Sequence, residues 1–167
     1  MYEFDFADTA FTTFALLRQA WTAVNKASEV KLAKAGLTPE KTAVLWACRD
    51  FPGTITPAEI ARLLFRENQS IAGLLNRMEK EGLVKRIPKR KGKPYTEIKM
   101  TSKGQQLVGP GVEIMKKLIK EFAAGLDVEQ QEQLQGLLRV VRGKGLEYLY
   151  IEPSQSTCAP PGQPITL

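Results

Sequence analysis

The sequence predicts a mainly α-helical fold that carries one small β-hairpin. Apolar residues recur at the helical spacing of three and four over most of the chain. Two short strand-like runs, at 84–87 and 95–100, enclose a turn of lysine, arginine, glycine and proline. At 167 residues and 43% hydrophobic content, the chain can bury one core but is short for two independent domains. We therefore expect one domain plus an oligomerisation layer.

The first predicted helix spans 8–35 and has apolar side chains along one stripe, namely Phe14, Leu17, Trp21 and Val24. Gly36 follows it in a position that suits a left-handed cap. A helix of this length measures roughly 42 Å, which is more than a small domain needs. The extra length of the helix predicts contact with a second subunit. The alternative is that the helix is an N-terminal arm that packs on its own domain.

A second helix is predicted from Thr38-Pro39 to about Phe51. Its apolar side holds Cys48, which we interpret as a small core residue. The alternative is a redox-sensing thiol, which needs exposure and a positive neighbour such as Arg49. Trp46 projects well away from this side of the helix.

Two further helices follow, separated by a short turn at 65–67. The stretch Thr56-Pro57-Ala58-Glu59 has the pattern of a capping box, so a helix starts at Pro57 and ends near Leu64. The next helix, 68–82, places four apolar residues on one stripe: Ile71, Leu74, Leu75 and Met78. That stripe predicts packing against the core.

The opposite face of helix 68–82 carries short polar side chains rather than Glu and Lys pairs. Asn and Gln can each bond an adenine edge twice, Ser bonds several edges, Arg suits guanine or phosphate, and Gly lets a backbone approach closely. The face is therefore a candidate base-reading surface, and the alternative is an ordinary solvent face. Its residues are Asn68, Gln69, Ser70, Gly73, Asn76 and Arg77.

The predicted hairpin is strongly basic. Its six cations, with no acid among them, equal the net charge of +6: Lys85, Arg86, Lys89, Arg90, Lys91 and Lys93. The positive charges in such a run repel one another unless a polyanion neutralises them, which favours a polyanion-binding site. The alternative interpretation is a solvent-exposed loop without a partner. After a polar helix, the basic run predicts a winged helix-turn-helix, in which the helix enters a DNA major groove and the hairpin contacts the backbone or the minor groove.

The remaining chain predicts two more helices and a tail. Thr101 caps a helix from 102 to about 124, which Gly109-Pro110-Gly111 is expected to kink or break, as a hinge or as static curvature. A capping box at 127–130 starts the last helix, which is expected to fray near 143–145. Both helices would pack with the first one against a twofold mate.

Several of these segments resemble the MarR family of bacterial transcriptional regulators. The resemblance covers roughly 8–142 and includes Leu37-Thr38-Pro39, the ending EKEGLV at 79–84, and MTSKG at 100–104. The family usually has Asp-x-Arg in the wing, where this sequence has Lys89 and Lys91.

The resemblance implies an N-terminal dimerisation helix (1–36), a winged helix-turn-helix DNA-binding lobe (37–101) and C-terminal dimerisation helices (102–151). The stretch 152–167 lies outside the resemblance, and its four prolines, single charge and lack of periodicity predict a tail. The resemblance also implies a homodimeric, sequence-specific regulator of double-stranded DNA, namely a repressor released by a small aromatic or anionic effector. In the family, effectors bind in a cleft between the lobe and the dimerisation helices. Trp21 and Trp46 are candidates for lining that cleft, with packing between helices as the alternative.

Composition argues against catalysis. The chain has no histidine, its two cysteines lie far apart, and no glycine-rich phosphate loop is present, so we expect no catalytic residues, no metal site and no cofactor. The acidic, aromatic start and the lack of a long apolar run predict a cytoplasmic protein without a membrane partner. An alternative from another class is a winged-helix protein-interaction module that does not bind specific DNA.

Overall fold

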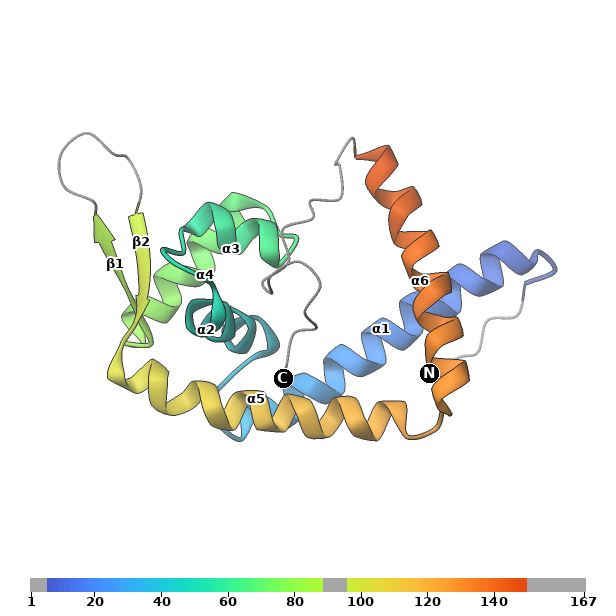
Figure 1. Cartoon of the computed structure of the whole chain (residues 1–167), viewed down its shortest axis with the longest axis horizontal. Helices are drawn as coiled ribbons and strands as arrows, with labels where there is room; N and C mark the ends of the chain where they lie inside the picture. Colours follow the sequence, from blue (N-terminus) through green and yellow to red (C-terminus); the bar gives the residue numbers. More distant parts are fainter. Residues whose placement is uncertain (1–5, 89–95, 150–167) are drawn as a thin grey trace.

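The structure, a computed structural model, describes residues 6–88 and 96–149. Helices α2 to α4 and the hairpin form a lobe at one end of the molecule, and α5 leads from the hairpin towards α6 (Figure 1). The predicted fold, mainly helical with one hairpin, is confirmed. In chain order the elements are α1 (Thr9–Ala33), α2 (Pro39–Asp50), α3 (Pro57–Leu63), α4 (Asn68–Lys80), β1 (Val84–Pro88), β2 (Thr96–Met100), α5 (Ser102–Ala123) and α6 (Val128–Tyr148).

Polar caps start the helices where the sequence predicts them. The Thr38 hydroxyl accepts from the Lys41 amide at 3.2 Å, and Asp127 and Gln130 exchange both bonds of a capping box. The box predicted at 56–59 is half formed: the Thr56 hydroxyl accepts from the Glu59 amide at 3.1 Å, whereas the Glu59 carboxylate accepts from Arg62 at 2.8 Å. Gly36 has the predicted left-handed conformation, with φ of 70°.

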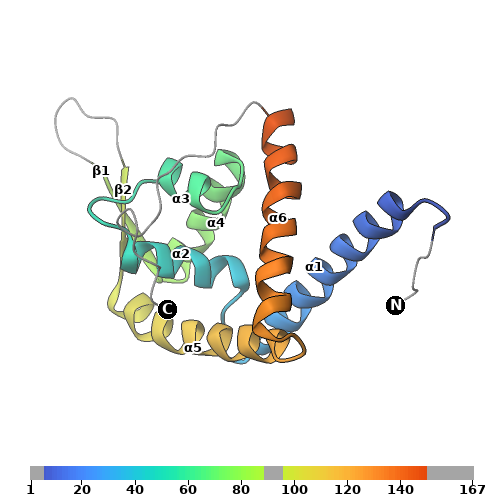
Figure 2. The same cartoon turned by 45° about the vertical axis from the view of Figure 1, so that its right-hand side comes forward.

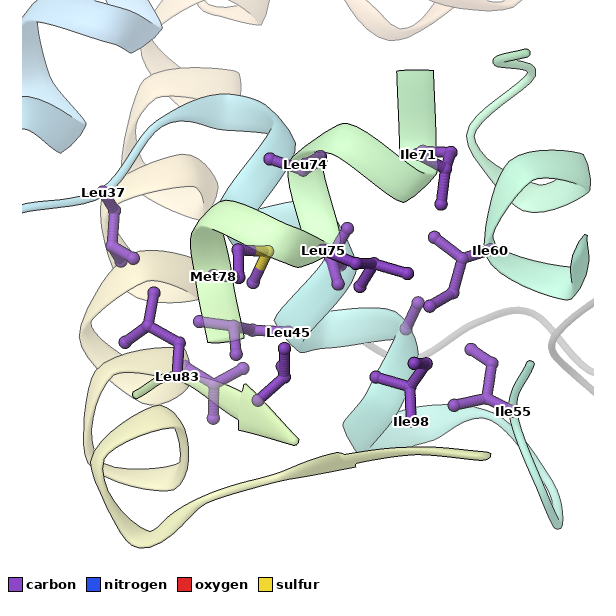
Figure 3. Close-up of a cluster of buried hydrophobic side chains, with 14 of the residues drawn as sticks. Leu37, Leu45, Ile55, Ile60, Ile71, Leu74, Leu75, Met78, Leu83 and Ile98 are labelled. Atoms are coloured by element: carbon purple, nitrogen blue, oxygen red, sulfur yellow. The ribbon is translucent and has the colours of Figure 1, made fainter. Parts of the chain in front are cut away.

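The buried face of α4 forms the centre of the core. Ile71, Leu74, Leu75 and Met78 are all buried, as their spacing predicts. They meet side chains from α2, α3 and β2, among them Leu45, Ile60 and Ile98 (Figure 3). Burial of this stripe fixes which face of α4 remains for solvent.

The hairpin is joined to the lobe at its base. β1 and β2 are antiparallel, with Arg86 opposite Ile98, and the Ile98 amide donates to the Ile55 carbonyl at 3.0 Å. The Thr101 hydroxyl, which caps α5, donates to the Gly82 carbonyl at 2.6 Å. The end of α4, the hairpin and the start of α5 are therefore held as one unit.

Of the kink or short break expected at Gly109-Pro110-Gly111, the break is wrong, because α5 continues through all three residues. Gly109 lacks the Cβ that would clash with the following proline ring in a helix. Gly111 packs so closely on the α1–α2 loop and on α2 that an added Cβ would lie 2.8 Å from Leu37 Cδ1 and 3.2 Å from Thr42 Cγ2. These residues therefore permit close packing of a continuous helix.

The expected fraying of α6 near 143–145 is also wrong, since the helix runs on to Tyr148. None of the residues of α6 is buried. The N-terminal part of α1 extends away from the lobe and likewise exposes large apolar side chains (Figure 2). In the described part of the chain, no helix combines the length and apolar character of a membrane span.

Candidate DNA-binding interface

The exposed face of α4 has three parts, which follow from its buried stripe at about 100° of rotation per residue. Gln69 and Asn76 lie on the side directly opposite the core. Ser70 and Arg77 lie on the edge towards α1 and α2, and the opposite edge, near Ala72, meets β1.

The structure brings the predicted base-reading residues onto one surface. Asn68, Gln69, Ser70, Asn76 and Arg77 are exposed, and Gly73 is half-buried. An added Cβ on Gly73 would meet Arg77 Nη1 at 3.7 Å, so the Arg77 guanidinium lies back across the glycine. The face offers amide, hydroxyl and guanidinium groups to a groove without rearrangement of the core.

The base of the wing presents cations on its outward face. Lys85 is exposed and pairs across the ladder with Lys99, whose ammonium lies 3.4 Å from Glu97 Oε1. Two like charges directly opposite each other are unfavourable unless an anion joins them. Sequence reasoning missed Lys99, although strand alternation and register could have found it.

Arg86 lies differently from the other predicted wing cations. Its Nη2 donates to the Ala72 carbonyl at 3.1 Å, and its backbone amide donates to Glu79 Oε1 at 2.9 Å. Nε is 3.9 Å from Glu79 Oε2, and the side chain is 30% exposed. Arg86 thus joins β1 to two turns of α4, and Glu79 is a positioning residue that the sequence did not indicate.

The remaining wing cations, Lys89, Arg90, Lys91 and Lys93, lie outside the described residues.

The C-terminal end of α4 is held from two sides. Lys41 of α2 places its ammonium 2.7 and 2.8 Å from the two carboxylate oxygens of Glu81. The Lys103 ammonium of α5 donates to the Glu81 carbonyl at 2.9 Å. These contacts fix the direction of α4 relative to α2 and α5.

An open hollow of about 650 Å³ lies between α1, α2, the α3–α4 turn and α4. Trp21 lines it and is 65% exposed. Trp46 does not line it: it packs against the core, on the side of α2 that carries Asp50. The structure therefore separates the two tryptophans that the sequence grouped.

Cys48 packs against the hydrophobic core of the lobe. Burial raises the pKa of its thiol to about 12, so the thiol stays protonated at neutral pH. A protonated thiol is a poor nucleophile, which favours the core interpretation over a redox sensor. Within the described residues, no three acidic, cysteine or histidine side chains are grouped as a metal site would need.

One segment of the chain is similar to a known protein family, and the whole chain is similar to several solved structures. Residues 35–93 match the MarR family. No match was found among curated protein sequences. The chain is similar to the organohalide-sensing transcriptional regulator RdhR in its 2,4-dichlorophenol-bound form, with a TM-score of 0.80, 23% identity, and coverage of 94% of this chain and 96% of that one.

Two structures that contain DNA are also similar. One is the S. aureus MepR–DNA complex, with a TM-score of 0.72, 22% identity, and coverage of 82% of this chain and 99% of that one. The other is a MarR mutant from E. coli with operator DNA, with a TM-score of 0.72, 21% identity, and coverage of 83% and 99%. The matched segment contains α2 to α4 and β1, so the lobe is similar to the MarR family, and the chain as a whole shares the winged helix-turn-helix fold of these solved structures.

Proposed function

We propose that the protein is a homodimeric, sequence-specific DNA-binding transcriptional regulator, and that it is a repressor released by a small molecule. The observation that carries this proposal is the exposed polar face of α4, which the buried stripe directs outward beside a basic wing. Two of the similar structures contain DNA, which supports the same use of this face.

In this proposal bases are read by the polar face of α4, with Gln69 and Asn76 at its centre. Lys85 and the wing cations beyond the described residues contact phosphates, which supply much of the affinity without reading sequence. Arg86 contributes by holding the wing.

The dimer is supported by the apolar side chains of α1 and α6. Phe14 of α1 and Leu137 and Val140 of α6 are each 66% exposed, and large exposed apolar patches on a protein surface mark interaction sites. In the proposed arrangement, residues 1–36 and 102–151 form the dimer layer, and two lobes (37–101) meet half-sites about one DNA turn apart.

The effector is proposed to bind the hollow beside Trp21. The hollow has the size of small-ligand sites and combines apolar walls with cationic groups. The RdhR structure with bound 2,4-dichlorophenol supports an aromatic effector. Release of DNA requires that the effector prefer the state that does not bind DNA.

The test is binding of the purified protein to its own upstream DNA and to random duplex at two salt concentrations, with the solution mass measured alongside. We expect a dimer that prefers the upstream DNA and whose affinity falls steeply with salt. A monomer that ignores both duplexes at low salt would refute the proposal and favour a protein-interaction module instead.

A further inference from the structure

The exposed face of α4 has a centre line and two unlike edges. Gln69, Gly73 and Asn76 follow one another along the centre line, at spacings of four and three residues, directly opposite the buried stripe seen in Figure 3. On one edge, the Ala72 carbonyl is bonded by Arg86 of β1. A DNA groove that receives α4 beside the wing therefore meets the centre line and the other edge.

Gln69 and Asn76 mark the two ends of the centre line, and both side chains are exposed. Seven residues separate them, which places their Cα atoms about 10 Å apart along the helix axis, or roughly three base-pair steps of B-DNA. A side-chain amide can bond the N6 and N7 atoms of adenine together. Each end of the centre line therefore favours an A·T pair.

Arg77 fills the middle of the centre line, although its own Cα lies on the edge. A Cβ added to Gly73 would lie 3.7 Å from Arg77 Nη1, so the guanidinium lies beside the place that a side chain of residue 73 would take. Long helical side chains lean towards the N-terminus of their helix, which carries this one back by about a turn. Between the two amides the face thus offers a guanidinium, which pairs best with O6 and N7 of guanine.

These three polar side chains are not engaged elsewhere in the described chain. Within 6–88 and 96–149, none of them forms a hydrogen bond or an ion pair. By contrast, Arg66 and Arg86 on neighbouring segments lie 3.8 and 3.9 Å from carboxylate oxygens. The three side chains can therefore bond base edges without breaking a contact.

We propose that each half-site in the DNA contains two A·T pairs about three base-pair steps apart, read by Gln69 and Asn76, with a G·C pair between them that is read by Arg77. This inference rests on the proposed function, because it names the base sequence that the DNA-binding face selects. Gly73 contributes by leaving the middle of the centre line to the guanidinium.

The experiment selects bound duplexes from a pool of random sequence with the full-length protein. Fluorescence anisotropy then compares the selected duplex with copies in which one base pair is changed. We expect the selected duplexes to share the order A·T, G·C, A·T. Each single change at these pairs should weaken binding about five- to a hundredfold, whereas a change outside the contacted pairs should not.

Substitutions assign each preference to one side chain. Gln69→Ala and Asn76→Ala should each remove the preference for A·T at one end only, and at different ends. Arg77→Ala should remove the preference for G·C in the middle. All three side chains are exposed, so their removal leaves the core intact.

The matched control is Lys85→Ala, which removes one exposed cation from the wing rather than from α4. It should weaken binding to every duplex alike and leave the three base preferences unchanged. A selected sequence without this order, or unchanged base preferences in the α4 variants, would overturn the inference but leave sequence-specific binding in place. No selected sequence at all, together with no binding of the upstream DNA, would instead reject the proposed function.

Discussion

Arg86 shows how one side chain can set the geometry of an interface. Its guanidinium bonds the Ala72 carbonyl, and its Nε is buried without a hydrogen-bond partner in the described chain. Glu79 lies beside it and also accepts from its backbone amide. Through these contacts the partly buried Arg86 fixes the angle between β1 and α4. This angle lets α4 and the wing contact DNA together.

Replacement of Arg86 by Met should therefore weaken DNA binding without removing a phosphate contact. We expect lower affinity for specific and random DNA alike, an unchanged slope of log K against log salt, and a loss of about 0.5–1.5 kcal/mol in unfolding free energy from the missing hydrogen bond. The control is Lys85→Met on the outward face of the same strand, which should reduce the salt slope by about one phosphate contact. Equal slope changes in the two variants would place Arg86 on the phosphates instead.

At the scale of the elements, α5 depends on a close approach at Gly111. The nearest atoms to an added Cβ are Leu37 Cδ1 at 2.8 Å and Thr42 Cγ2 at 3.2 Å, and both residues are buried. Gly111 thus lets α5 pack closely against the α1–α2 loop and against α2. A side chain there has to displace buried neighbours.

Gly111→Ala should destabilise the protein, because overpacking costs about 1–3 kcal/mol and the gain in helix propensity returns at most about 1 kcal/mol. The control is Gly145→Ala, at an exposed position of α6 where no atom lies within 4 Å of an added Cβ. That variant should gain up to about 1 kcal/mol. Denaturant unfolding measures both, and equal stabilisation of the two variants would show that the packing at Gly111 is loose.

Local patterns predicted most of these elements, and tertiary contacts explain the exceptions. The stripe of α4 and the caps at Thr38 and Asp127 were predictable because they depend on residues within one or two turns. The continuity of α5 was not predictable, because a Gly-Pro-Gly run indicates a break in a helix. The packing of Leu37 against Gly111 is known only from the tertiary structure.

In the candidate site, too, local features could be predicted from the sequence and tertiary contacts could not. The exposed face of α4 was predictable from its buried stripe, but the inward turn of Arg86 depends on the distance between β1 and α4. Trp21 and Trp46 were grouped as candidates for the effector cleft that the family resemblance implies, and only the tertiary structure shows that Trp21 lines the hollow while Trp46 packs against the core. The hollow is built from α1, α2 and the stretch 64–77, which meet only in the tertiary structure, so no local pattern predicts it.

For the whole molecule, the apolar surface of α6 is the feature that a single chain leaves unexplained. Leu134, Leu137, Leu138 and Val141 lie on one face and are all exposed. Each leucine buried in an interface contributes about 1.5–3 kcal/mol. In a dimer with twofold symmetry each such contact occurs twice, once for each subunit, so burial of this face of α6 can stabilise a dimer.

Leu137→Glu should therefore convert the protein towards monomer. Two losses of about 1.5–3 kcal/mol, one per subunit, raise the dimer dissociation constant by roughly two to four powers of ten. Upstream-DNA affinity should fall as well, because the second half-site is no longer tethered to the first. Gln135→Glu, an exposed change on the same helix, serves as the control and should leave the mass unchanged. Sedimentation equilibrium measures the mass, and a Leu137→Glu protein that stays dimeric at low concentration would move the interface away from α6 and require another explanation for its apolar face.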